Sequence, residues 1–527
     1  MPAEQGTMQN GNGISHETAL HDGPRPNGKQ DVAPAAVVVN GSTGQSSHGP
    51  RRKPHFTSTT YPSNCLRFLD NCVPEQGHEA GVSSKQEPPL VEQAKLKLDI
   101  LIVGAGLGGL ATATALARRG HKVTVFEQAA ELTEVGAGIQ IPPNSGKLLQ
   151  RWGVMNHLLD QAVQPDGISF RRWQSGEQIG FTDLSPEFAA TYGAPYYVVH
   201  RAHLHSALFK RATELGVVVH LGCRVNGYNP DTPSVTLADG TIFAGDLVIA
   251  ADGIKSIARE YVTTSIRSKP KATGFAAYRA TVDVQKMRQI PEISWILEKP
   301  GLNIWIGEDR HVMTYTIAAG QSFNMVLSHM DQSDASRWNQ LSQERVLGDM
   351  KAEFGGWDPQ LLKIIDLIDS ALKWPLIGGN SLETWTSPSS RLVVLGDAAH
   401  AMLPYMSQGA AMAVEDGAAL ALVLNKVRSL AELKFALGLF QTERKRRTGM
   451  MQEASMVNAM LWHFQDGPEQ RARDAAMRPE VEGRNFLSSP NQWSDPLTQD
   501  WAYGYDAEKI ISEEWEGAIS ELIQQHK

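Results

Sequence analysis

Residues 98–109 read LDILIVGAGLGG, and this stretch decides the fold. Its apolar beginning predicts a buried strand that runs directly into Gly104, Gly106 and Gly109, in the order Gly-x-Gly-x-x-Gly. The first glycine permits a tight turn, the second lets the backbone approach a pyrophosphate, and the third lets a helix pack closely on the strand. The Ala- and Leu-rich residues 110–119 predict that helix. The stretch is therefore typical of a nucleotide-binding strand–turn–helix unit.

A second strand and an acidic residue complete this unit. Residues 123–126 (VTVF) predict a strand that ends on Glu127. A carboxylate roughly 20 residues after the glycines is placed to hold an adenosine ribose through its hydroxyls. A glycine triplet alone often marks an ordinary turn, but the order strand, glycines, helix, strand and acid is far more specific. Together these features predict a dinucleotide site.

A polar junction much later in the chain resembles the other half of a cofactor site. Residues 391–395 (RLVVL) predict a buried strand that gives way to a loop at Gly396-Asp397, and a helix of small residues is expected to begin at Gly409. The carboxylate of Asp397 can accept hydrogen bonds from sugar-like hydroxyls. The free N–H groups at the start of the helix favour negative charge on a ligand.

Composition narrows the class of protein. A chain of 527 residues with 42% hydrophobic content suits a large enzyme of several domains, and the net charge of -8 argues against nucleic acid as a partner. The three cysteines form neither a disulfide framework nor a paired Cys-x-x-Cys metal spacing, which favours a reducing compartment. Glu415 and Asp416 interrupt the longest apolar stretch. We therefore expect a cytoplasmic protein with no metal, nucleic-acid or membrane partner.

Changes in composition and periodicity divide the chain. The fold class expected is α/β: a doubly wound, Rossmann-like parallel sheet, an inserted antiparallel-sheet substrate domain and C-terminal helices. Residues 1–94 are expected to be a disordered N-terminal extension, and 466–527 a C-terminal helical tail. The cofactor-binding domain is expected in two parts, 95–264 and 391–465, with the substrate domain, 265–390, between them.

Several ordered motifs together resemble a known family. They are the glycine pattern with Glu127, Arg201 at a helix start, Asp252-Gly253, and Gly396-Asp397 with Pro404 and Gly409. The chain is in these respects similar to the single-component, FAD-dependent aromatic hydroxylases, and most similar to the salicylate hydroxylase-like flavoprotein monooxygenases of fungal secondary metabolism. The resemblance extends from about residue 96 to the end of the chain, including WAYGYDA at 501–507.

The resemblance implies FAD as the bound cofactor and NADPH or NADH as a transient cosubstrate. It implies that Gly104, Gly106 and Gly109 contact the pyrophosphate and that Glu127 holds the adenosine ribose. Asp252, with the glycine after it, is implied in binding both the FAD pyrophosphate and NAD(P)H.

The flavin end of the cofactor is assigned by the same resemblance. His400 and Pro404 are expected to lie against the flavin, where His400 is either a general base or a neighbour that transfers no proton. The resemblance implies Gly138 and Gln140 beside the flavin ring, and Arg201 near the ribityl chain or the pyrophosphate. It implies Asp397 on the ribityl hydroxyls, and Gly409 with Ala410 at the pyrimidine end of the ring.

The family's chemistry implies that O2 reacts with reduced flavin to give a C4a-hydroperoxide that hydroxylates a phenolic or aromatic acid substrate, with or without loss of a carboxylate. The alternative is epoxidation or oxidation of a prenylated or indole-type secondary metabolite by the same flavin chemistry. The partners expected are the small-molecule substrate, O2 and NAD(P)H, for a monomer or homodimer.

Arg279 and Tyr315 are the expected catalytic residues. An electron-rich phenolate reacts best with an electrophilic oxygen, so the site needs a cation or a hydrogen-bond donor for the phenolate. The resemblance to fungal phenol hydroxylases implies that these two side chains bind and activate the substrate. Residues 275–282 and 311–317 read as strands, and alternation places Arg279 on one face with Phe275 and Tyr315 on one face with His311. Both faces can line one cavity.

Overall fold

The computed structural model describes residues 89–132, 137–263 and 269–525, all of which belong to one compact unit. Most of the extension expected to be disordered therefore lies outside the described residues. At its end, Ala94 is buried and its N–H donates to the carbonyl of Arg119 at 2.8 Å.

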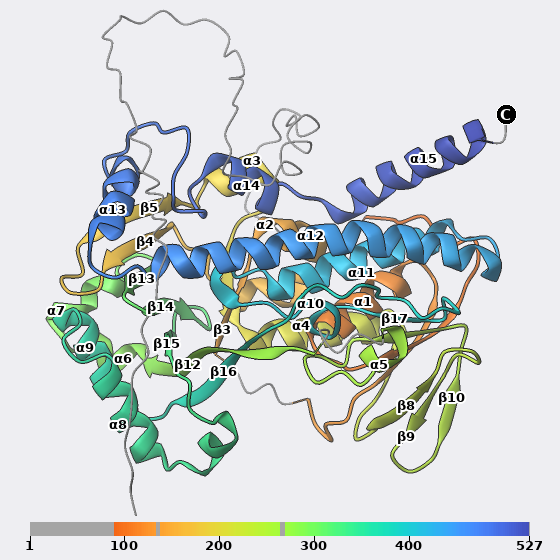
Figure 1. Ribbon diagram of the computed structural model, residues 1–527, viewed down its shortest axis with the longest axis horizontal. Coiled ribbons are helices and arrows are strands. Elements are labelled where there is room, and N and C mark those ends of the chain that lie inside the picture. Colours follow the sequence, from red (N-terminus) through yellow and green to blue (C-terminus); the bar gives the residue numbers. More distant parts are fainter. Residues whose placement is uncertain (1–88, 133–136, 264–268, 526–527) are drawn as a thin grey trace, which may run out of the picture. The chain divides into compact units, whose positions relative to one another are not determined.

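The strand that precedes the glycines occupies the centre of a parallel sheet, as a nucleotide-binding unit requires. Figure 1 shows the arrangement of the helices and strands. The strand order is β17-β11-β1-β2-β7. These strands are β1 (Asp99–Val103), β2 (Lys122–Phe126), β7 (Val218–His220), β11 (Leu247–Ala250) and β17 (Leu392–Val394). The connection between β7 and β11 is a small antiparallel sheet of β8 (Val225–Asn229), β9 (Ser234–Leu237) and β10 (Ile242–Ala244).

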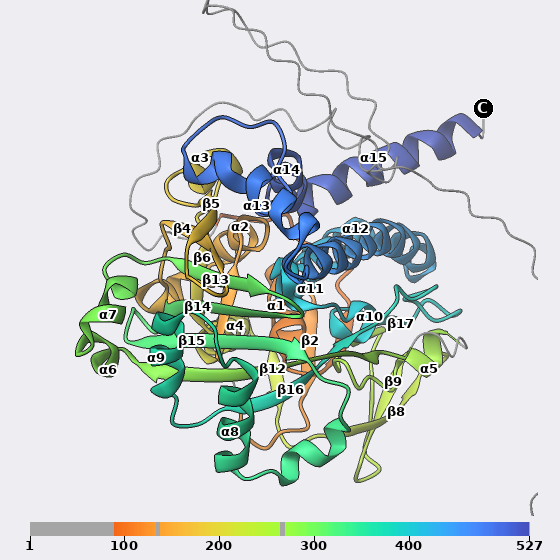
Figure 2. The same cartoon turned by 60° about the vertical axis from the view of Figure 1, so that its left-hand side comes forward.

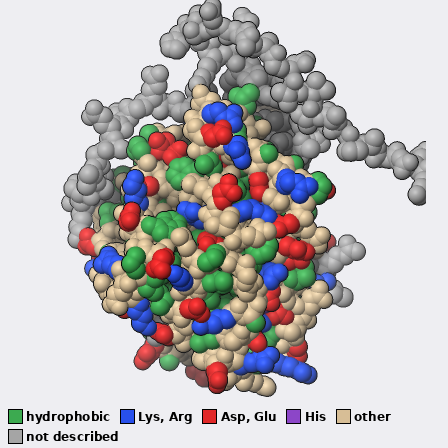
Figure 3. Space-filling model, turned by 90° about the vertical axis from the view of Figure 1, so that its left-hand side faces the viewer, with side chains coloured by type: hydrophobic (Ala, Val, Ile, Leu, Met, Phe, Trp, Pro, Cys, Tyr) green, Lys and Arg blue, Asp and Glu red, His purple; other side chains and the backbone are tan. Residues whose placement is uncertain are grey.

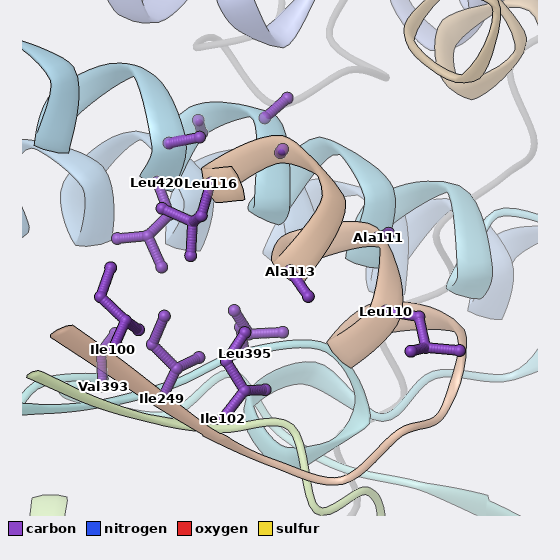
Figure 4. Close-up of a cluster of buried hydrophobic side chains, with 14 of the residues drawn as sticks. Ile100, Ile102, Leu110, Ala111, Ala113, Leu116, Ile249, Val393, Leu395 and Leu420 are labelled. Atoms are coloured by element: carbon purple, nitrogen blue, oxygen red, sulfur yellow. The ribbon is translucent and has the colours of Figure 1, made fainter. Parts of the chain in front are cut away.

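Three helices pack together over this sheet: α1 (Leu107–Arg118), α4 (Arg201–Glu214) and α11 (Gly409–Lys426). Figure 4 shows Ile100 of β1 and Ile249 of β11 facing Leu116 of α1 and Leu420 of α11. All four side chains are fully buried. This apolar layer holds the starts of α1 and α11 at one edge of the sheet.

The segment between β11 and β17 contributes most of a seven-stranded sheet, ordered β16-β12-β15-β14-β13-β4-β5 (Figure 2). All neighbours are antiparallel except β13 and β4. Two of its strands, β4 and β5, come from the part of the chain expected to bind the cofactor. The strands are β4 (Gly167–Arg172), β5 (Gln178–Asp183), β12 (Lys271–Asp283), β13 (Leu302–Gly307), β14 (Arg310–Ile317), β15 (Ser322–Met330) and β16 (Leu372–Gly378).

Alternation along these strands separates two cores. Met313 and Tyr315 of β14 belong to the cluster that faces the cofactor-binding domain, whereas Val312 belongs to the cluster on the other face. That other face is covered by α6 (Val284–Arg288), α7 (Pro291–Ser294), α8 (Gln343–Glu353) and α9 (Pro359–Asp366) (Figure 2). The alternation predicted for β14 is thus confirmed.

The remaining described elements surround these two sheets. A two-stranded sheet of β3 (Gly138–Ile141) and β6 (Tyr197–His200) leads into α2 (Pro143–Arg151) and α4 respectively. The C-terminal helix α15 (Ala507–Gln525) packs on α11 and buries Ile511. The other α-helices are α3 (Glu187–Tyr192), α5 (Arg259–Val262), α10 (Asp397–His400), α12 (Leu433–Trp462), α13 (Pro468–Val481) and α14 (Pro496–Tyr503).

The structure confirms the expected α/β class with a parallel sheet, a separate antiparallel sheet and C-terminal helices. Acidic and basic side chains are interspersed over the face shown in Figure 3, with no broad area of one sign. Within the described ranges, every helix is too short or too polar to cross a bilayer.

Candidate functional site

A cavity of about 330 Å³ lies where the ends of the parallel strands meet the seven-stranded sheet. Its cofactor-domain wall is made by the turns that follow β1, β11 and β17 and by the start of α11. The opposite wall comes from side chains of β12, β14 and β15. The two parts of the chain that carry the glycine and Asp397 motifs therefore face one space together with the predicted substrate residues.

Nine of the thirteen predicted site residues line this cavity. They are Gly106, Gly138, Gln140, Arg201, Arg279, Tyr315, Asp397, Gly409 and Ala410.

The other four, Gly104, Gly109, Glu127 and Asp252, lie behind the lining. The Glu127 carboxylate accepts hydrogen bonds from the backbone N–H groups of Ala105 at 2.8 Å and Ala129 at 2.9 Å. These two bonds hold the carboxylate beside the glycine turn. Asp252 accepts a hydrogen bond from the Tyr228 hydroxyl at 3.0 Å through Oδ2, and its buried Oδ1 has no hydrogen-bond partner among the described residues. Its two neighbours along the chain, Ala251 and Gly253, do line the cavity.

The cofactor-domain wall fits the phosphate and sugar groups of FAD. The N-cap residues of α1 and α11, Gly106 and Gln408, make no side-chain capping bond, so the first N–H groups of both helices remain available. A Cβ at Gly106 would meet no atom within 4 Å, which leaves room for a ligand beside the backbone. The exposed Asp397 carboxylate accepts no hydrogen bond from a described residue. Donors for phosphate and an acceptor for hydroxyls thus face one space.

The opposite wall holds an arginine beside a tyrosine. Arg279 has no carboxylate partner among the described residues, and burial lowers its pKa, an effect that nearby Tyr315 opposes and Arg201 reinforces. Burial raises the pKa of Tyr315 although Arg279 and Gln140 act in the opposite direction. The backbone of Gly138 allows this arrangement, because a Cβ there would lie 2.3 Å from the Tyr315 ring. The wall therefore offers a cation and a neutral hydroxyl to a ligand.

Arg259 is a residue of this region that sequence reasoning missed. Its guanidinium donates to the carbonyls of Asp397 and Ala398, both at 2.7 Å, and to that of Ile254 at 2.7 Å. It therefore ties the loop after β11 to the turn after β17. The sequence around Arg259 gave no local signal for its contacts with Asp397 and Ala398, since these two residues lie far along the chain.

A buried ion cluster supports the start of α11. Arg444 of α12 donates to Glu415 at 2.7 Å and to Asp416 at 2.8 Å, and all three side chains are fully buried. Arg447 adds a second contact to Glu415 at 3.1 Å. Burial alone would raise the pKa of Asp416, but His400 and Arg444 together lower it to about 2. The Glu-Asp pair was visible in the sequence, whereas its partners on α12 were not.

The expectations for the turn after β17 are only partly met. Asp397 begins the short helix α10 rather than an open loop. His400 is buried behind the cavity lining, with Nε2 2.6 Å from Asp416 and its ring against Trp385. Pro404 does line the cavity. Since Asp416 also accepts the Gly396 N–H at 3.0 Å, the geometry gives His400 a part in supporting the turn.

Two glycine substitutions should separate folding from cofactor binding. Gly109→Ala places a Cβ 1.9 Å from the Gly104 carbonyl oxygen, so we expect it to destabilise the FAD-free protein by about 1–3 kcal/mol. Gly106→Ala meets no protein atom, so it should leave that stability within about 1 kcal/mol and weaken FAD binding about tenfold or more. Urea denaturation and flavin titration measure the two effects. Equal effects of both variants on folding would contradict this assignment.

Comparisons with known proteins agree with this geometry. The family model for the FAD binding domain matches residues 97–454. The FAD-dependent monooxygenase OpS4 of Beauveria bassiana (strain ARSEF 2860) is 36% identical over 413 residues, covering 78% of this chain and 95% of the relative. The 6-hydroxynicotinate 3-monooxygenase of Bordetella bronchiseptica (strain ATCC BAA-588 / NCTC 13252 / RB50) is 33% identical over 390 residues, covering 73% and 97%.

Among solved structures, a substrate complex of salicylate hydroxylase has a similar fold. The TM-score is 0.65 at 24% identity, and the match covers 79% of this chain and 98% of that chain. At this level of identity the similarity concerns the fold alone.

Proposed function

We propose that this chain, which belongs to the FAD binding domain family and is an FAD-dependent monooxygenase, hydroxylates the ring of a phenolic or aromatic acid substrate. The observation that carries the proposal is Arg279, a partly buried cation in the cavity wall with no carboxylate partner among the described residues. An unpaired cation in such a place is costly unless a ligand completes it. A phenolate or aromatic carboxylate is the ligand that complements it.

The residues that would hold FAD are those of the cofactor-domain wall: Glu127 for the ribose, the starts of α1 and α11 for negative charge, and Asp397 for hydroxyls. When bound, FAD carries electrons from NAD(P)H to O2 and supplies one oxygen atom to the substrate. Gly138 and Gln140 then belong to the boundary between the cofactor and the substrate.

Arg279 and Tyr315 would orient the substrate and increase its electron density. Arg279 attracts the phenolate oxygen, and the Tyr315 hydroxyl can donate to the same oxygen because its raised pKa keeps it protonated at neutral pH. The apolar side chains of Met313, Val326 and Leu403 line the same cavity and exclude water. In this environment the charge on the substrate is stabilised by fixed groups rather than by solvent.

The full-length protein provides the test. We expect purified protein to carry flavin absorbance and to oxidise NADPH or NADH faster when phenolic acids such as salicylate or 4-hydroxybenzoate are present. The product should gain one oxygen atom, and isotopically labelled O2 should supply it. Protein without flavin would contradict the central assignment. Coenzyme oxidation that never yields a ring-hydroxylated product would contradict the proposed reaction, and an epoxide from a prenylated or indole-type substrate would support the alternative chemistry.

We propose that the domain boundaries follow the cavity, with residues 95–264 and 391–465 holding FAD and 265–390 supplying most of the substrate wall. Residues from the two FAD-holding ranges and from 265–390 all line the cavity, which supports this division. Localisation in the cytoplasm and a monomeric or homodimeric state are part of the same proposal, and size-exclusion chromatography with light scattering tests the latter.

A further inference from the structure

A groove outside the cavity shares one wall with it. The groove has a volume of about 620 Å³ and is lined by the start of β12, the end of β16, the loop after α10 and one face of α12. Met402 and Leu403 are the described residues that line both the groove and the cavity. These two residues form a partition one layer of side chains thick between the groove and the space assigned to FAD.

Hydrogen bonds hold the backbone of the partition. The Gly379 N–H donates to the carbonyl of Ala401 at 3.0 Å. Gln452 of α12 donates through Nε2 to the same carbonyl at 3.0 Å and to that of Gly379 at 2.9 Å. The Met402 side chain is unbranched and half-buried, so it can change rotamer while this backbone stays in place. Its Cγ would lie 3.8 Å from a Cβ at Gly409, so the partition reaches the start of α11.

The α12 side of the groove is open because of a glycine. A Cβ at Gly449 would meet no atom within 4 Å. Met456 and Val457 are 52% and 41% exposed, so apolar side chains are available to an aromatic ring. The residues of α12 that line the groove share one helical face: Gly449, Gln452, Glu453, Met456 and Val457.

The charges of the groove favour an anionic ligand. Its lining contains two cations, Lys269 and Lys271, and one acid, Glu453. Lys271 makes no ion pair or side-chain hydrogen bond with a described residue. Lys269 pairs with Glu260 at 3.3 Å, where the two side chains are 70% and 69% exposed. Such an exposed pair contributes little to stability, so Lys269 can exchange its partner for a ligand.

We propose that this groove binds the nicotinamide dinucleotide that reduces FAD, with its phosphates at the two lysines and its nicotinamide ring at Met402. This inference rests on the proposed monooxygenase reaction, in which NAD(P)H supplies the electrons. The C4–H bond of the dihydronicotinamide breaks, and its hydride passes to FAD with both electrons of that bond, so the coenzyme leaves oxidised. The phenol and the coenzyme then use separate surfaces, since the phenol occupies the wall that carries Arg279 and Tyr315.

Size, charge and position together select this occupant. The volume of about 620 Å³ lies within the roughly 300–1,000 Å³ typical of small-molecule sites. The lysines complement a diphosphate, and the apolar side chains of α12 complement the rings of a dinucleotide. A hydride donor has to come into contact with FAD, and the groove adjoins the space assigned to FAD through the partition. A phenolic substrate passing through would use the partition but would have no need of the two lysines.

Gly449→Phe tests the groove by filling it in the flavin-loaded, full-length protein. We expect it to weaken the binding of NADP+ and NAD+ by about tenfold or more and to raise the KM for the reduced coenzyme similarly. Flavin content and the dissociation constant of a phenol should not change. Calorimetry with the oxidised coenzymes measures binding without turnover, and thermal midpoints identify a variant that misfolds.

Gly438→Phe is the matched control. Gly438 also lies on α12, and a Cβ there would likewise meet no atom within 4 Å. It lines neither the groove nor the cavity. Coenzyme binding and KM in this variant should stay within about twofold of the wild type, a difference well below 1 kcal/mol.

Charge variants give a second measurement that does not depend on packing. Lys271→Gln should weaken NADP+ binding by about two- to fivefold, and Glu453→Gln should strengthen it by a similar factor. Both effects should shrink as salt is added. Lys363→Gln is the control, because Lys363 pairs with Glu292 on the surface and lines neither space.

The outcomes separate the groove from the proposed function. Unchanged coenzyme binding in both Gly449→Phe and Lys271→Gln would overturn the groove while leaving phenol hydroxylation intact. A Gly449→Phe enzyme whose KM rises for the phenol alone would make the groove a route for the substrate, which also overturns the assignment. If the wild type oxidises NAD(P)H but hydroxylates no phenol, the proposed function fails, and weaker coenzyme binding in Gly449→Phe would still support the groove.

Discussion

Arg444→Met is expected to lower the free energy of unfolding by about 3–5 kcal/mol. The substitution keeps much of the side-chain volume but leaves Glu415 and Asp416 buried without their main cation. Both carboxylates are 0% exposed, and Arg444 lies 2.7 Å and 2.8 Å from them. The other two basic side chains of the cluster, Arg447 and His400, contact one carboxylate each. Urea denaturation of the FAD-free protein measures the loss.

A surface arginine provides the control for this prediction. Arg345 pairs with Asp349 at 2.9 Å one helical turn away on α8, where both side chains are exposed. Arg345→Met should change stability by no more than about 0.5 kcal/mol. A similar small effect of Arg444→Met would show that the buried cluster does not stabilise the junction of α11 and α12. Because Asp416 also accepts the Gly396 N–H, the Arg444 variant should weaken FAD binding as well.

Arg279→Met should lower kcat/KM for a phenolic acid by about 100-fold. The loss of a hydrogen bond to a charged group, about 1.5–3 kcal/mol, accounts for most of this effect. Flavin content should be unchanged, because Arg279 comes from the substrate wall. Stability should be unchanged or slightly higher, since the substitution removes a cation that has no partner among the described residues. Steady-state kinetics and thermal unfolding measure the two effects.

Arg310 is the matched control for Arg279 within the same sheet. It lies at the start of β14 and pairs with Glu353 at 3.3 Å, away from the cavity lining. Arg310→Met should keep kcat/KM within about twofold of the wild type. An Arg279→Met enzyme that hydroxylates acidic and neutral phenols at wild-type rates would rule out Arg279 as the anion-binding group.

Much of the fold could be predicted because its signals are local. The strand, glycines and helix at 98–119 specify one another by direct contact, so a short stretch predicts them together. Alternation along 311–317 was enough to place His311, Met313 and Tyr315 on one face. The structure brings that face and Arg279 to the same cavity, as expected.

Other features could not be predicted because no local pattern encodes them. β4 and β5 join the large sheet through pairing of β4 with β13, more than a hundred residues later. Arg259 and Arg444 look in the sequence like ordinary charged residues of helices. Their buried partners are determined only when separate elements pack together.

Periodicity and glycine placement thus specify the cofactor-binding unit and the two faces of the sheet, because both depend on residues a few positions apart. The identity of the groups that meet across the cavity depends on how distant segments pack. Tertiary structure alone brings His463 to His311 and Arg444 to Asp416. It also leaves Arg279 beside Tyr315 without a carboxylate among the described residues, and this arrangement of charge is what favours an anionic aromatic substrate.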